Sequence, residues 1–143
     1  MILLDTNVLS EVVRAKPAPQ VLAWMDGLRP TTVYVTSVTE AEMLLGVALL
    51  PAGKRRSALS SKVGTLFTTH FHQRCLPFDS PAASHYAQIV SHLQRIGKPI
   101  STEDAQIAAI AVSHGYQLAT RNVSDFAHIE KLNIFNPWDH QRK

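Results

Sequence analysis

The chain has 143 residues, of which 45% are hydrophobic and 17% are charged, and its formal net charge at pH 7 is +3. This composition is typical of one folded domain, residues 1–143, and excludes a mainly disordered chain. Cys75 is the only cysteine, which excludes an internal disulfide and a cysteine-based zinc site. Because no apolar run is long enough to cross a bilayer and the N-terminus does not resemble a signal peptide, we expect a cytoplasmic protein with no membrane contact.

The first half of the chain alternates short strands with helices. The apolar run 2–4 predicts a buried strand, and 5–13 combines N-cap residue types with helical spacing. A second helix is predicted at 19–28. The β-branched and aromatic segment 32–37 predicts another strand, which leads directly into a helix at 39–46.

The second half continues this alternation. Helices are predicted at 54–70, 81–96 and 101–114, and short strands at 74–79, 116–120 and 133–135. The pattern indicates an α/β domain with three α/β/α layers, in which a mostly parallel central sheet is flanked by helices. In such folds the ligand crevice lies at the carboxyl ends of the strands.

Four acidic residues are placed where this crevice is expected. Asp5 ends the first strand, Glu42 falls in the first turn of the helix after the second strand, Asp104 falls in the first turn of the helix from 101, and Asp125 lies in a predicted loop. Such a cluster stays ionised in a partly dry crevice only beside a counter-charge. Mg²⁺ supplies that charge through oxygen ligands, and it polarises a phosphodiester and helps to ionise water.

Each of these acids also fits a purely structural role. Glu42 and Asp104 lie three residues after a threonine and a serine, which is the spacing of a helix capping box. Asp5 is a suitable N-cap, and Asp125 is a suitable turn residue. Four ordinary caps, however, have no reason to fall on one edge of a sheet.

Several ordered motifs resemble one family along the whole chain. The chain is similar to PIN-domain nucleases, particularly the VapC and FitB-like toxins of bacterial toxin–antitoxin pairs. The matching segments, in order, are Ile2–Glu11, Ser37–Gly46, Ser101–Ala109, Leu118–Phe126 and Asn136–Trp138. Met43 is the one noted departure, at a position where leucine is common in the family.

The resemblance implies a metal-dependent endoribonuclease with a PIN-like fold. It implies Mg²⁺, for which Mn²⁺ substitutes, held by the catalytic acids Asp5, Glu42, Asp104 and the more variable Asp125. Substrate-binding roles are expected for Thr6, Thr120, Arg121 and Asn122.

The same resemblance implies particular partners. The substrate would be RNA, and a small DNA-binding antitoxin of the VapB or FitA type would block the crevice, with an arginine inserted among the acids. A homodimer and a larger toxin–antitoxin complex are also expected.

Basic residues leave two interpretations open. The stretch 54–56 together with Lys62 either contacts RNA phosphates or forms a solvated helix face. Arg121, nearer the predicted crevice, either contacts a phosphate or pairs with a site acid.

Two other functions compete with a nuclease. Phosphoryl transfer through a covalent aspartate needs a second acid close to the first, and Asp5 is followed by Thr6-Asn7-Val8-Leu9. A catalytically silent PIN-like module that only binds RNA or protein is the other alternative, and the intact set of acids disfavours it.

Overall fold

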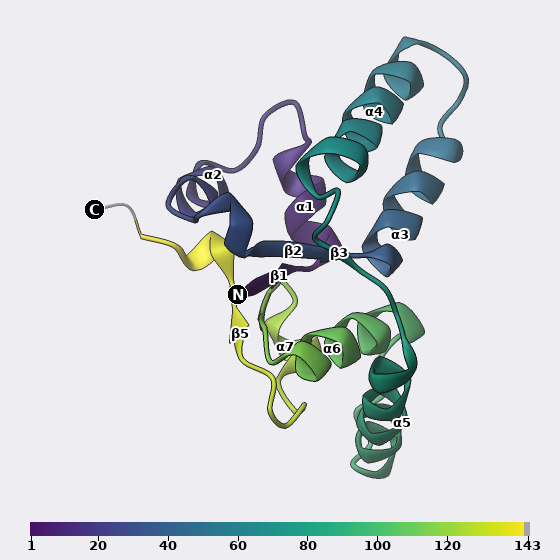
Figure 1. Ribbon diagram of the computed structural model, residues 1–143, viewed down its shortest axis with the longest axis vertical. Coiled ribbons are helices and arrows are strands. Elements are labelled where there is room, and N and C mark those ends of the chain that lie inside the picture. Colours follow the sequence, from purple (N-terminus) through teal and green to yellow (C-terminus); the bar gives the residue numbers. More distant parts are fainter. Residues whose placement is uncertain (142–143) are drawn as a thin grey trace.

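The computed structural model describes residues 1–141 and has a five-stranded sheet at its centre (Figure 1). The strands run in the order β3-β2-β1-β4-β5. They are β1 (Ile2–Leu4), β2 (Val33–Thr36), β3 (Cys75–Leu76), β4 (Gln117–Ala119) and β5 (Ile134–Phe135). Every neighbouring pair is parallel, which confirms the predicted sheet. The first strand of the chain therefore lies in the middle, between β2 and β4.

Helices cover both faces of this sheet. They are α1 (Thr6–Val12), α2 (Pro19–Asp26), α3 (Ser37–Ala48), α4 (Lys54–Thr65), α5 (Ser80–Arg95), α6 (Thr102–His114) and α7 (Val123–Phe126). Helices α1 to α4 lie on one side of the sheet and α5 to α7 on the other, which gives the three layers predicted (Figure 1). No helix within residues 1–141 has the length and apolar character needed to span a membrane.

Two apolar clusters hold the layers together. Neighbouring residues of a strand point to opposite faces, so Leu4 packs with α1, α2 and α3 whereas Leu3 packs with α5 and α6. In β4, Ala119 and Leu118 divide in the same way between the two faces. All four side chains are fully buried, so a slip of one residue in register would exchange both faces.

The helix that carries Glu42 begins earlier than predicted. The hydroxyl of Thr36 caps α3 by accepting a hydrogen bond from the Thr39 amide, 3.0 Å away. Since α3 starts at Ser37, Glu42 lies in the second turn and not in the first. The capping-box interpretation of Glu42 is therefore wrong, because its place at the helix start is taken by Thr36.

Three other predicted boundaries also shift. Helix α4 ends at Thr65 and continues as a π-helical turn over Leu66–His70. Strand β3 is a two-residue edge strand followed by Pro77, which has no amide hydrogen to continue the ladder. Asp125, predicted in a loop, lies in the four-residue helix α7.

Candidate active site

The carboxyl ends of the strands bring the predicted site residues together. Asp5 follows β1 and is the N-cap of α1, Thr120 follows β4, and β2 leads into α3 with Glu42. Asp104 lies in the first turn of α6 and Asp125 in α7. Asp5 is only 2% exposed, whereas Asp125 is open to solvent. The site thus has a buried floor and a hydrated rim.

Asp5 is held by donors on both carboxylate oxygens. Its Oδ1 accepts from the Thr6 amide at 2.8 Å, and its Oδ2 accepts from the Thr120 hydroxyl at 2.7 Å and from Asn7 Nδ2 at 3.1 Å. Burial raises the pKa of Asp5, these three hydrogen bonds counteract part of the rise, and the charge of Asp125 adds to it. Capping α1 uses Oδ1 only, whereas Oδ2 is held by Thr120 and Asn7, which lie at the site.

The charges of the other three acids all raise the pKa of Asp104. Burial, the charge of Asp5 and smaller contributions from Asp125 and Glu42 together raise its pKa to about 6, against a hydrogen bond from Ser101 that lowers it. Ser101 also caps α6, because its hydroxyl accepts from the Asp104 amide at 3.2 Å. The four predicted acids, from four separate segments, therefore share one electrostatic environment.

Glu42 and its neighbour Glu40 point to different places. Glu42 Oε1 accepts a hydrogen bond from the Thr6 hydroxyl at 2.7 Å. Glu40 Oε1 lies 4.0 Å from the Sγ of Cys75, at the edge of the sheet. Burial, and then the Glu40 charge, raise the pKa of the Cys75 thiol to about 11. Two residues apart on a helix, the glutamates do not share a face.

Asn7 joins the two loops that form the floor of the site, a role that sequence reasoning missed. Its Nδ2 donates to Asp5 and, at 3.4 Å, to the Thr120 hydroxyl, while its Oδ1 accepts from the Arg121 amide at 3.1 Å. The available signal is the run Asp5-Thr6-Asn7, but its local spacing predicts only the start of a helix. One side chain thereby ties the β1–α1 connection to the β4–α7 connection.

Arg121 and Asn122 lie at the exposed rim. The Arg121 guanidinium lies 4.8 Å from the centre of the Trp138 ring, a cation–π contact. Within residues 1–141 it makes no ion pair with a site acid, so that alternative is wrong. The Asn122 amide donates to the Thr120 hydroxyl at 3.1 Å, which turns the chain around the site.

The donors around the site fit a hard cation. They are carboxylate and hydroxyl oxygens, with neither cysteine nor histidine among the predicted acids and their hydrogen-bond partners. In the part of the chain that the structure describes, no three acids, histidines or cysteines form a compact ready-made metal cage. Mg²⁺ keeps several waters and takes only one or two protein carboxylates besides substrate phosphates, so the open arrangement suits it.

A groove of about 740 Å³ leads away from the site between α1, α3 and α4. Thr6 and Glu42 line the end of the groove at the site. Apolar side chains line it farther on, and its basic side chains are Arg14, Lys16, Arg55 and Lys62. Part of the predicted basic stretch therefore faces this groove.

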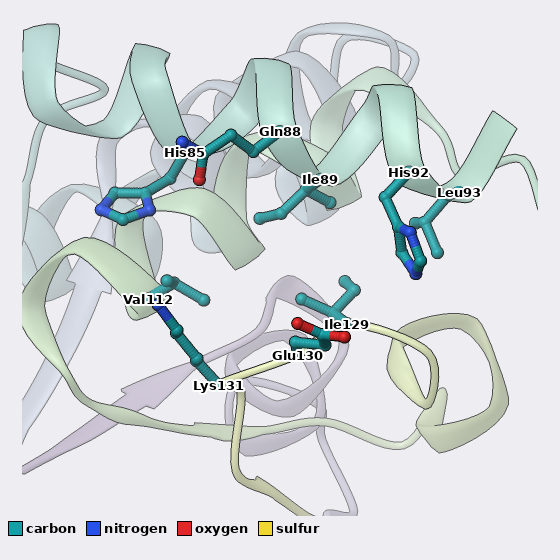
Figure 2. Close-up of a pocket in the computed structure, with 9 residues that line it drawn as sticks. All are labelled: His85, Gln88, Ile89, His92, Leu93, Val112, Ile129, Glu130 and Lys131. Atoms are coloured by element: carbon teal, nitrogen blue, oxygen red, sulfur yellow. The ribbon is translucent and has the colours of Figure 1, made fainter. Parts of the chain in front are cut away.

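A second hollow, of about 250 Å³, is separate from the acids (Figure 2). It lies between α5, α6 and the segment before β5, and its polar lining includes His85, His92, Glu130 and Lys131. Figure 2 shows the two histidines on α5 facing the other two side chains across the hollow. None of the predicted site residues lines it.

Comparisons with known proteins agree with this geometry. The PIN domain model matches residues 2–132. Toxin FitB of Neisseria gonorrhoeae is 44% identical over 138 residues, 96% of this chain and 99% of that protein. VapC ribonuclease Y4jK of Sinorhizobium fredii is 42% identical over 139 residues, 97% of this chain and 99% of that protein.

Solved structures show the same fold. The structure of FitAB bound to an IR36 DNA fragment matches with a TM-score of 0.91 at 44% identity, covering 99% of each chain. DNA-bound VapBC of Salmonella typhimurium matches with a TM-score of 0.80 at 27% identity, covering 95% of this chain and 97% of that one. With the family model, the full-length relatives and the site at the carboxyl edge of the sheet in agreement, the chain belongs to the PIN-domain family, among its VapC ribonucleases and FitB toxins.

Proposed function

We propose that residues 1–143 act as a single-domain, divalent-metal-dependent endoribonuclease in the cytoplasm, the toxin of a type II toxin–antitoxin pair. The observation that carries the proposal is the convergence of Asp5, Glu42, Asp104 and Asp125, because burial together with the charges of the other three acids raises the pKa of Asp104 to about 6. Like charges gathered at the carboxyl ends of parallel strands repel one another unless a cation lies between them. This edge is also where ligands bind in such folds, so a cation there can meet a phosphate backbone.

The four acids would hold Mg²⁺, with Mn²⁺ as a substitute. Asp5 is the fixed point of the set because three donors hold its carboxylate, whereas Asp104 and Asp125 approach from helices on the other face of the sheet. When bound, the ion supplies charge stabilisation to the phosphodiester and lowers the pKa of the attacking water.

Neighbouring polar groups would position the RNA. Thr6 orients Glu42, and Thr120 orients Asp5. Arg121 is the exposed cation nearest these groups in sequence, and it would bind a phosphate oxygen, since its guanidinium stacks on Trp138 and has no acidic partner among residues 1–141. The exposed Asn122 side chain adds a neutral donor at the same rim.

An antitoxin is the expected inhibitor. The relatives FitB and VapC are seen in solved toxin–antitoxin complexes, some of them bound to DNA. In this chain, the groove that ends at Thr6 and Glu42 would accept an extended or helical segment whose apolar side chains fill the groove and whose acidic groups meet its basic side chains.

Cleavage of a labelled RNA tests the proposed reaction. We expect cleavage with Mg²⁺ or Mn²⁺, its loss in EDTA, and a fall of about 100-fold or more for Asp5→Asn. Glu42→Gln and Glu40→Gln form a matched pair, because both remove one negative charge from α3 and only Glu42 faces the site. The first should reduce kcat at least about tenfold, and the second less than about twofold.

Two results would contradict the proposal. Full activity in chelator would exclude the metal, and equal effects of the two glutamate variants would mean that the wrong face of α3 was assigned. RNA binding without cleavage in any metal would instead favour a silent binding module.

A further inference from the structure

Three threonine hydroxyls form a chain that ends on Glu42. Thr36 ends β2, Thr39 lies in the first turn of α3, and Thr6 is the first residue of α1. The Oγ1 atoms of Thr36 and Thr39 are 3.4 Å apart, those of Thr39 and Thr6 are 2.9 Å apart, and Thr6 Oγ1 lies 2.7 Å from Glu42 Oε1. Thr36 and Thr39 are fully buried, so within residues 1–141 their hydroxyls are satisfied by these contacts and by the hydrogen bond that Thr36 Oγ1 accepts from the Thr39 amide.

Counting protons sets the direction of this chain. A threonine hydroxyl has one proton, and Thr6 donates its proton to the Glu42 carboxylate. In the contact between Thr6 and Thr39, the donor must then be Thr39. The proton of Thr36 points to Thr39 in turn, so all three hydroxyl dipoles are aligned toward the carboxylate. Aligned hydrogen bonds of this kind strengthen one another.

The hydroxyl of Thr39 is used in an unusual way for a helix. Helical threonines commonly return this proton to a carbonyl three or four residues earlier in the same helix, as Thr68 does to the Gly64 carbonyl at 2.8 Å. The Thr39 hydroxyl instead bonds to the Thr6 hydroxyl of α1, so this hydrogen bond joins two different helices. It lies on the face of Glu42, three residues before it, so it lies below that carboxylate in α3.

We propose that Thr39 is a positioning residue for the metal site. By donating to Thr6, it commits the Thr6 proton to Glu42 and holds that carboxylate in the orientation that faces the other three acids. Thr39 does not touch the ion or the RNA and acts only through Thr6. This inference rests on the proposed function in one respect, namely that Glu42 is a metal ligand.

Binding of Mn²⁺ without RNA tests this role apart from catalysis. Electron paramagnetic resonance of free Mn²⁺ gives the affinity of wild type, Thr39→Val, Thr39→Ser and Thr68→Val. We expect Thr39→Val, which keeps the shape and removes the hydroxyl, to weaken Mn²⁺ binding about tenfold. Thr39→Ser should stay within about threefold of wild type. Thr68→Val, the same change at an exposed helical threonine, should have no effect.

A second arm separates positioning from general structural damage. In a Glu42→Gln background, Thr39→Val should change Mn²⁺ affinity less than about twofold, because the group that it orients is already altered. If Thr39→Val fails to give the wild-type circular dichroism spectrum, Thr39→Ala carries the same expectations.

The failures are distinguishable. Wild-type affinity in folded Thr39→Val, or an undiminished effect in the Glu42→Gln background, overturns the role of Thr39 and leaves the nuclease proposal standing. Absence of Mn²⁺ binding in the wild type overturns both.

Discussion

At the scale of single residues, Asp104 is an acid whose charged form the fold disfavours. Its pKa is raised to about 6 by burial and by the other acids, so the charged form is unfavourable in the folded protein. In EDTA at pH 8, Asp104→Asn should therefore raise the free energy of unfolding by about 1 kcal/mol, after allowance for solvent screening of this half-buried carboxyl. Thermal unfolding should show a Tm higher by about 2–4 °C, with cleavage abolished.

The pH dependence of this gain has a definite sign. A carboxyl whose pKa is raised on folding binds its proton more readily in the folded state, so the wild type recovers stability as the pH falls through about 6. The advantage of Asp104→Asn should therefore disappear by about pH 4, near the ordinary pKa of aspartate. Glu103→Gln, at an exposed neighbour in the same turn, is the control and should bring no gain. A large loss of stability in Asp104→Asn would show that its carboxyl is mainly a helix cap.

The sequence predicts the acids better than the residues that hold them. Asp5, Glu42 and Asp104 can be placed from where strands end and helices begin. Asn7 and Thr39 depend on partners that lie far along the chain, the Arg121 amide 114 residues away and the Thr6 hydroxyl 33 residues away. No local spacing contains that information, because it arises only when parallel strands bring distant loops together.

At the scale of elements, the order of strands and helices follows from the sequence, whereas several boundaries do not. Propensity extends the second strand into Ser37, but the Thr36 hydroxyl caps α3 and starts the helix at Ser37. Likewise, the helical composition of 54–70 does not reveal the change to a π-helical turn at Leu66. A single capping bond, worth about 1 kcal/mol, is enough to move such a boundary.

The link between the β1–α1 and β4–α7 connections is also a matter of elements. Asn7→Ala removes hydrogen bonds to Asp5, Thr120 and the Arg121 amide at once. We expect the free energy of unfolding, measured in urea, to fall by about 1–3 kcal/mol.

A control at another loop makes this prediction specific. Asn133→Ala, at an exposed position before β5, should change the free energy of unfolding by less than about 0.5 kcal/mol. Similar losses in the two variants would refute the role of Asn7 as a link between loops.

At the scale of the whole molecule, α3 and its C-cap Leu49 expose an apolar strip that the described part of the chain does not cover. Leu44, Leu45 and Leu49 are 50%, 59% and 75% exposed. We predict that this strip forms the interface of the expected homodimer. Light scattering coupled to size exclusion should show a dimer for the wild type and a monomer for Leu45→Glu.

Leu22→Glu is the matched control, because Leu22 of α2 is 37% exposed and lies outside the strip. It should leave the dimer intact. A monomeric wild type at micromolar concentration, or a dimer that survives Leu45→Glu, would exclude this surface.

The central place of β1 has a consequence for synthesis. Strand β1 is made well before β4, so its second edge is paired only after β4 has left the ribosome. Until then Asp5 lacks the Thr120 hydroxyl, and a nascent chain shorter than about 100 residues carries only two of the four acids. The proposed set of four acids is therefore complete only after α7 has been made, and we expect shorter products not to cleave RNA.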